Sequence, residues 1–315
     1  MIIRNFIRDY NLHTIEASIG ETRNMKINAV YLASAVNDEV KNHIHQKMQE
    51  IENEDIYDLG ELARFFQKGH LSLFPQSLLT ERPDQAAARL RSGKVVIFFD
   101  HHTFCIITPI QLFESFSSNE DRSFTVKWNY SFVRLLRFVG VFIGTLLPAL
   151  YVTLVAFHPE LIPTKMAITI AQSRSQIPLD APTEALVMLF ALDVLVEASI
   201  RLPSFVGQTI GIVGGLVIGT AAVEAGLVSN IMVITIAFTA IAIFMVPYWE
   251  FVATWRLLRY LYVIAASVLG LYGMTLAVGW TILHLCKLNN LGHSYLSPVV
   301  PLQFKKLFHF FYPEK

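Results

Sequence analysis

The sequence is poor in charge and in cysteine. Only 16% of its 315 residues are charged, against roughly 25% in an ordinary soluble domain. The formal net charge is zero and no block of lysine and arginine stands out, so we expect no nucleic-acid partner. The two cysteines, Cys105 and Cys286, do not indicate a disulfide framework.

The sequence also lacks the marks of secretion and catalysis. Charged residues at Arg4, Arg8 and Asp9 interrupt the apolar core that a signal peptide needs, so the first half should stay in the compartment of synthesis. No glycine-rich phosphate loop or Walker-type pattern is present. One polar group lies at a predicted turn without the second ligand pair of a zinc site: Asp100, His101, His102 and Cys105. We therefore expect no enzyme, no metal site and no cofactor.

The sequence does contain long runs of apolar residues. Hydrophobic residues make up 53% of it, and the mean hydropathy is +0.46. Most of the charge falls within residues 1–130, whereas 138–286 hold nearly continuous apolar runs. This division predicts a small soluble α/β domain at 1–127, an all-α polytopic membrane domain of about four to six helices at 128–290, and a C-terminal tail at 291–315.

Alternating patterns in the first part predict a mixed domain of three or four strands with helices packed on them. The predicted elements are strands at 26–34, 95–100 and 103–108, and helices after Asn37, over 58–66, and from Pro83 to a closing Gly93. A two-residue turn at His101-His102 should join the last two strands.

The second part contains four firm or fairly firm spans and one or two doubtful segments. The first span is expected at 138–157, where Pro148 removes a backbone hydrogen bond and should kink the helix. The proline-rich segment 158–183 could lie in the membrane interface or re-enter. The remaining apolar elements are 184–200, the glycine segment 207–226, then 229–250 and 261–285.

Basic residues give a conflicting topology at the C-terminal end. Arg134 and Arg137 precede the first span and favour a cytoplasmic N-terminal side. Basic residues then stand on both sides of the last expected span: Arg256, Arg259, Lys287, Lys305 and Lys306. One simple crossing cannot place both of its ends in the cytoplasm.

Four glycines recur at intervals of four in the segment GQTIGIVGGLVIGTAAVEAG. In a helix, Gly207, Gly211, Gly215 and Gly219 form one narrow stripe along which a second helix can lie very close. Glu224 falls on the far face. The pattern is compatible with helix packing and an interfacial acid. It is also compatible with a packed stripe whose opposite face, with Glu224, borders a water-filled path.

Three charged residues follow at i, i+4 spacing and share one helix face: Asp193, Glu197 and Arg201. Glu197 and Arg201 have the favourable order for a helical ion pair at membrane depth. Charges at that depth normally face a partner or water. The set is either a salt-bridged helix end or part of an aqueous vestibule that attracts cations, as acidic rings do in cation-selective pores.

Several long segments are similar to the A subunits of GerA-type spore germinant receptors. They are TERPDQAAARLRSGKVVIFFD at 80–100, LLPALYVTLVAFHPELIPTKMAITIAQSRSQIP at 146–178, RLPSFVGQTIGIVGGLVIGTAAVEAGLVS at 201–229 and HSYLSPVVPL at 293–302. The resemblance implies a multi-pass protein of the spore's inner membrane, with the N-terminal domain on the cytoplasmic, core side. It implies self-association, possibly as a pentamer, into a nutrient-gated ion channel, together with a transporter-like B subunit and a lipoprotein C subunit.

The chain departs from the family pattern in two ways. Family members carry two N-terminal α/β subdomains, and this sequence resembles only the second. An Asp-Gly turn is replaced by Asp100-His101, which suggests an altered turn, since glycine suits a positive φ. The alternatives to a channel are a non-conducting scaffold or docking subunit, a truncated inactive paralogue, and a secondary transporter.

Overall fold

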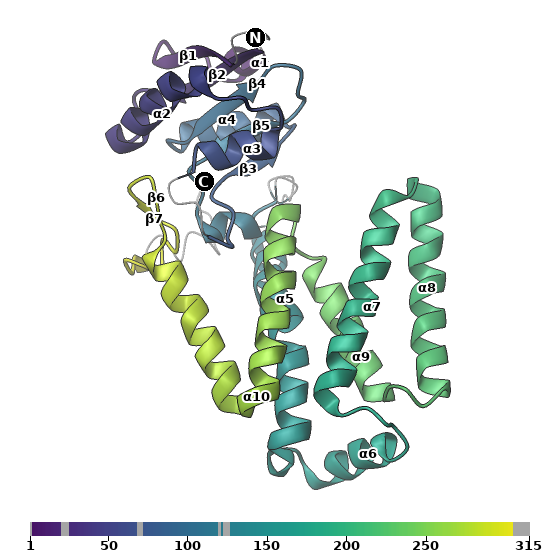
Figure 1. Ribbon diagram of the computed structural model, residues 1–315. Helices are drawn as coiled ribbons and strands as arrows, with labels where there is room; N and C mark the ends of the chain where they lie inside the picture. Colours follow the sequence, from purple (N-terminus) through teal and green to yellow (C-terminus); the bar gives the residue numbers. More distant parts are fainter. Residues whose placement is uncertain (1, 20–24, 68–71, 119–120, 122–126, 305–315) are drawn as a thin grey trace. The chain divides into compact units, whose positions relative to one another are not determined.

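The computed structural model describes the chain except for residues 1, 20–24, 68–71, 119–120, 122–126 and 305–315. The chain divides into two compact units. The sheet unit comprises Met1–Phe132 and Leu283–Lys315, and the helical unit comprises Val133–Ile282. Figure 1 follows both along the chain.

Five antiparallel strands form the sheet among the described residues of the sheet unit, in the order β1-β2-β4-β5-β3. The strands are β1 Leu12–Ile19, β2 Met25–Leu32, β3 Leu78–Thr80, β4 Val95–Phe99 and β5 Cys105–Thr108. The three predicted strands are present, but the expected total of three or four is wrong. β1 was missed because polar residues interrupt its apolar pattern, and β3 because it is only three residues long.

The three predicted helices of the sheet unit are present as α2 Asp38–Glu50, α3 Leu59–Phe65 and α4 Pro83–Arg91. The structure adds α1 Ile2–Phe6, which was not predicted, and 3₁₀ turns at Ile51–Asn53 and Leu112–Phe116. The Asn37 side chain accepts a hydrogen bond from the Glu39 amide and caps α2. Val40, Ile44 and Met48 then turn one face of α2 into the core, against the inward residues of β2 and β4.

The loop between β4 and β5 is longer than expected. Phe98 and Cys105 are the last paired residues, so the predicted two-residue turn at His101-His102 is wrong. His101 has φ 65°, in the left-handed region where histidine is enriched several-fold among non-glycine residues. His101 therefore adopts a positive φ in this loop although it is not a glycine.

The described end of the chain is built into the sheet unit. After the last helix come the short paired strands β6 Asn289–Asn290 and β7 His293–Ser294. Asn290 Nδ2 donates to the carbonyl oxygens of Gln76 (2.8 Å) and Ile110 (3.3 Å). Tyr295 Oη donates to the carbonyl oxygen of Pro75 at 2.8 Å, and Leu291 is fully buried in the core. The sheet unit is thus completed by residues that follow the helical unit in sequence.

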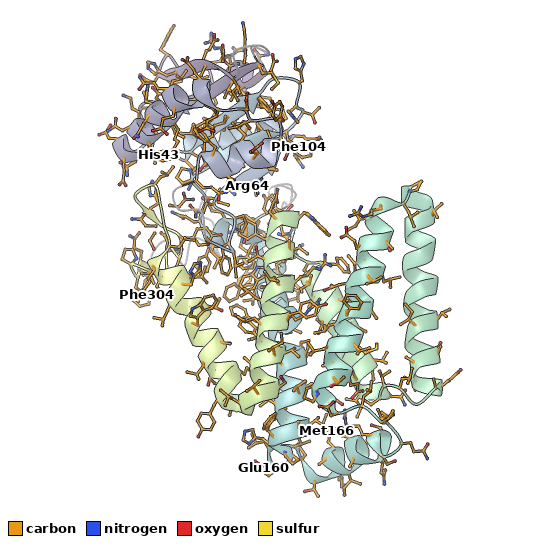
Figure 2. The ribbon with its side chains drawn as sticks, viewed as in Figure 1. His43, Arg64, Phe104, Glu160, Met166 and Phe304 are labelled. Carbon is orange, nitrogen blue, oxygen red and sulfur yellow. The ribbon has the colours of Figure 1, made fainter. Side chains whose placement is uncertain are left out.

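The helical unit begins within α5 Lys127–Val152, which continues as a π-helix over Thr153–Phe157. Then come a 3₁₀ turn at Pro159–Leu161, α6 Thr164–Arg174, α7 Ala181–Arg201, α8 Ser204–Glu224, α9 Asn230–Ile243 and α10 Trp249–Lys287. The expected span at 229–250 is shorter in α9, which ends at Ile243, shortly before Pro247; the residue before a proline is disfavoured in helix. In α6, Ile170 alone is buried and Met166 is exposed (Figure 2).

The single span expected at 261–285 is wrong, because α10 is two helices joined at Gly270. That glycine has φ 57° and ψ −133°, a conformation available essentially to glycine alone. Tyr262 Oη donates to Thr281 Oγ1 at 2.9 Å, which joins the two arms, and Figure 1 shows them folded back on each other. A hairpin removes the topology conflict, since both of its ends can lie on one side. Lys305 and Lys306, which entered that argument, lie outside the described residues.

Two helices are long and apolar enough to cross a membrane, within the part of the chain that the structure describes. They are Trp128–Phe157 and Trp249–Lys287, and the shorter Asn230–Ile243 is also apolar. At 1.5 Å per residue each arm of α10 is about 25–30 Å long, close to the thickness of the hydrocarbon core.

Candidate functional site

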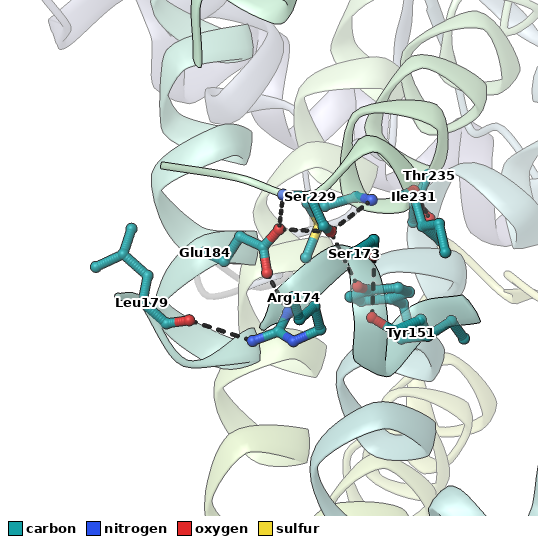
Figure 3. Close-up of polar contacts among 10 residues, drawn as sticks. Tyr151, Ser173, Arg174, Leu179, Glu184, Ser229, Ile231 and Thr235 are labelled. Atoms are coloured by element: carbon teal, nitrogen blue, oxygen red, sulfur yellow. Dashed lines mark hydrogen bonds and ion pairs between the residues drawn. The ribbon is translucent and has the colours of Figure 1, made fainter. Parts of the chain in front are cut away.

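A buried polar junction lies where α5, α6, α7 and the start of α9 meet; we call Tyr151, Arg174, Glu184 and Ser229 the Glu184 junction (Figure 3). Glu184 stands in the first turn of α7 and is 0% exposed. Its Oε1 accepts from the Ser229 amide at 2.6 Å and the Ser229 hydroxyl at 2.8 Å. Its Oε2 is paired with Arg174 Nη1. Both carboxylate oxygens are therefore engaged away from solvent.

The surrounding bonds fix these partners in place. Arg174 also donates to the Leu179 carbonyl oxygen at 3.2 Å. Ser229 is the N-cap of α9, and its Oγ accepts from the Met232 amide at 3.2 Å. Because the Ser229 hydroxyl hydrogen is used on Glu184, the Tyr151 hydroxyl, 3.3 Å away, donates to Ser229 Oγ. The ion pair joins α6 to α7, and the hydrogen bonds of Ser229 and Tyr151 connect this pair to α9 and α5.

The sequence pattern predicted the apolar element 184–200 but not the Glu184 junction at its start. Arg174 lies in the proline-rich segment, and Ser229 is 45 residues beyond Glu184. The available signal was a lone carboxylate in the first turn of an apolar helix, with an arginine ten residues before it. Such a buried acid needs a cation and hydrogen-bond donors.

Asp193, a candidate for either a salt-bridged helix end or a vestibule, is paired with two arginines of α10. Its Oδ1 accepts from Arg256 Nε at 3.1 Å and from Arg259 Nη2 at 2.9 Å. Its Oδ2 accepts from Tyr260 Oη at 2.6 Å. We call Asp193, Arg256, Arg259 and Tyr260 the Asp193 cluster.

Glu197 and Arg201 form the ion pair that their spacing predicts. Arg201 donates to Glu197 Oε1 through Nε at 3.1 Å and Nη2 at 2.7 Å. The Glu197 side chain is 52% exposed and the Arg201 side chain is 77% exposed. The depth of the pair in a membrane stays a prediction. Neighbouring acids on one face of α7 thus have different surroundings, because Asp193 is held by α10 and Glu197 is open.

The glycine stripe lies on α8, where residues of α7 and α9 pack beside it. A Cβ at Gly207 would stand 2.5 Å from the Ser199 carbonyl oxygen of α7, and one at Gly211 would be 3.5 Å from Ser199 Oγ. Gly215 lies beside Leu195 of α7, and Gly219 beside Val233 of α9.

Glu224 lies at the end of a helix, and Pro148 lies in the interior of another. Glu224 is the last residue of α8 and is exposed. Pro148 is buried inside α5, five residues before the π-helix begins. A kink at Pro148 and a pore-lining role for Glu224 remain predictions.

These observations define a class of protein: a folded α/β unit joined to a unit of apolar helices, in which Glu184 and Arg259 are buried with charged partners. Residues 1–313 match the family model described as Bacillus/Clostridium GerA spore germination protein. The chain belongs to this GerA family.

Named relatives agree with the family. The chain is 39% identical to spore germination protein GerLA of Bacillus cereus over 97% of this chain and 62% of that protein. It is 36% identical to spore germination protein KA of Bacillus subtilis (95% and 55%) and 37% identical to its spore germination protein A1 (94% and 61%). The chain therefore spans 55–62% of the length of these relatives.

A solved structure is also similar in sequence. The N-terminal domain of the A subunit of the Bacillus megaterium spore germinant receptor GerK3 is 27% identical, with a TM-score of 0.27, over 34% of this chain and 86% of that one.

Proposed function

We propose that this chain is a membrane subunit of a spore nutrient germinant receptor and associates with itself to form an ion path whose opening starts germination. Membership of the GerA family supports the receptor role. The ion path rests on α8. This 21-residue helix has a single charged residue, Glu224, and packs in its own chain mainly against α7 through its glycines. Val206, Val217 and Ile218 of α8 are exposed, which leaves apolar surface for a second copy.

The proposal carries a topology and partners. Crossings by α5, α7, α8, α9 and the two arms of α10 fall within the expected four to six, and the α10 hairpin returns the chain to the side of the sheet unit's first segment. That side is the cytoplasm, or spore core, and the membrane is the spore's inner membrane. The partners are further copies of the chain, possibly five in all, a transporter-like B subunit and a lipoprotein C subunit. The role is non-enzymatic.

The test is potassium flux through liposomes that contain the purified chain, with and without the partner subunits. We expect flux, and we expect Glu224→Gln or Glu197→Gln to change it because each removes an exposed negative charge from the proposed path. Glu160→Gln is the matched control, since Glu160 is an exposed acid outside α7 and α8. If no potassium flux is measured with or without the partner subunits, the proposal that the chain forms a channel is wrong.

A second candidate is a docking subunit that does not conduct. It is favoured by a groove of about 630 Å³ in the sheet unit, within the range of ligand and docking pockets. The groove runs between α1, the start of α4 and the outer face of β1 and β2, where Arg4, Glu16, Asn28 and Arg82 supply polar groups. Partner subunits that copurify with a chain lacking any flux would establish this role, and flux would exclude it. A truncated inactive paralogue would show neither, and spores lacking the chain would release potassium normally after nutrient addition.

A further inference from the structure

The Asp193 cluster contains more positive than negative charge. Two guanidinium groups, of Arg256 and Arg259, share the single carboxylate of Asp193. Glu197, one turn further along α7, is paired with Arg201. Asp193 lies about 18 Å along the axis from the first residue of α7, well inside the helix. An uncompensated charge in such a place costs several kcal/mol.

Arg259 also carries a hydrogen-bond donor without an acceptor. Its side chain is 1% exposed, and its Nε–H has no acceptor among the described residues. Asp193 already accepts three hydrogen bonds, and at the end of α9 the carbonyl oxygens of Ala240 and Ile243 accept from the amides of Phe244 and Val246. A buried donor of this kind needs an acceptor from elsewhere.

A small cavity lies beside these guanidinium groups. Its lining includes Asp193, Arg256 and Arg259, together with the apolar side chains of Leu192, Ile243 and Phe244. Its volume is about 10 Å³, which is room for one atom or monatomic ion and not for a polyatomic group. A tetrahedral phosphate or sulfate is too large for it.

We propose that this cavity binds one monatomic anion, a halide such as chloride, on the Nε–H of Arg259. The anion brings the cluster to zero net charge and supplies the missing acceptor. A neutral water would supply the acceptor but leave one positive charge uncompensated, so the charge count favours the anion. The site holds α10 against α7 and is independent of the proposed ion path.

The test compares thermal unfolding of the purified full chain in potassium chloride, potassium bromide and potassium gluconate at equal ionic strength. A ligand that binds only the folded state raises its melting temperature. We expect a rise of about 2–4 °C in either halide over gluconate at saturating concentration, and none in Arg259→Gln. Arg201→Gln, which removes an exposed arginine of α7, is the matched control and should keep the halide effect. Comparing variants in the same salts cancels the general effects of anions on stability.

A second variant and a second measurement cover the case in which Arg259→Gln fails to fold. Arg259→Lys keeps the charge but lacks the Nε–H, and its halide effect should be smaller than that of the wild type. Crystals grown in bromide should show anomalous density beside Arg259 Nε. Equal melting temperatures in halide and gluconate would overturn the proposal. So would density for a water, or for a carboxylate of a second copy, at that nitrogen.

Discussion

The two units place polar and apolar residues in opposite ways. In the sheet unit the core is apolar, with Ile27, Ala29 and Ile97 fully buried, and most charged residues are exposed, although Lys94 is buried beside Glu114. In the helical unit Glu184 and Arg259 are buried, while large apolar residues such as Phe238 and Val268 are exposed. The difference is the one we expect of a chain folded for two solvents: burial of apolar side chains stabilises a fold in water, whereas in hydrocarbon apolar side chains can be exposed and polar groups need partners.

The largest expected effect comes from breaking the Glu184 junction. Glu184→Gln leaves the partly buried Arg174 without its counter-ion, and loss of one partner of a buried ion pair costs about 3–5 kcal/mol of unfolding free energy. Glu197→Gln, in the exposed pair near the other end of α7, should cost no more than about 1 kcal/mol. Thermal unfolding of the purified variants measures both.

A double variant tests whether the first effect is due to the pair. Adding Arg174→Gln to Glu184→Gln removes the stranded cation, so the double variant should be more stable than the sum of the single losses implies. Strictly additive losses would contradict an ion pair as the cause.

The next effect comes from placing a charge on the exposed surface of each unit. Phe238 is 60% exposed in α9, and Phe238→Asp should cost about 2.5–3.5 kcal/mol of membrane insertion. Tyr10 is fully exposed in the sheet unit, and Tyr10→Asp should change nothing. The measurement is the inserted fraction after synthesis in the presence of membranes. Equal insertion of the two variants would mean that the exposed face of α9 does not meet lipid.

A smaller effect is expected from filling the close contact of α8 with α7. The Cβ of Gly207→Ala would meet the carbonyl oxygen of Ser199, a backbone atom that cannot rotate away, and overpacking of this kind costs about 1–3 kcal/mol. Gly279→Ala in α10 has nothing within 4 Å of the added Cβ and should be neutral or slightly stabilising. Thermal unfolding measures the stability of both variants. If they are equally stable, Gly207 is not needed for the close packing of α8 on α7.

The smallest effect concerns an ion pair of the sheet unit, at Glu114. Burial by itself raises the pKa of this carboxyl, but Lys94 and Arg89 beside it outweigh burial and hold the pKa below its ordinary value. Since the pKa is lowered by folding, the stabilisation is present above the unfolded pKa of about 4.3 and is lost as the pH falls through the folded pKa. Unfolding of wild type and Glu114→Gln from pH 7 to pH 3 should therefore converge at the acid end. Glu16→Gln is the control, because Glu16 is exposed.

Local patterns could predict much of the sheet unit. The cap at Asn37, the buried face of α2 and the start of α4 at Pro83 each depend on residues a few positions apart. β1 could not be found in this way, because its register is set by pairing with β2 rather than by its own alternation. Its polar residues are tolerated on the outer side of the sheet.

The helical unit was less predictable because its decisive contacts join distant residues. Asp193 meets Arg256 and Arg259 more than 60 positions later, and nothing in the spacing of either segment indicates the other. Gly270 resembles any glycine of an apolar helix until its φ is known. The pairing of Glu197 with Arg201 was predictable, since both lie on one helix face.

The placement of Leu291 and Tyr295 also bears on how the chain is made. The last strand of the sheet is complete by Thr108, yet these two residues emerge from the ribosome only after the entire helical unit. At bacterial rates of translation the earlier part waits on the order of 10–35 s for them. A nascent chain that stalls or is cut within its apolar helices lacks both residues, and the core that Leu291 completes then stays partly open.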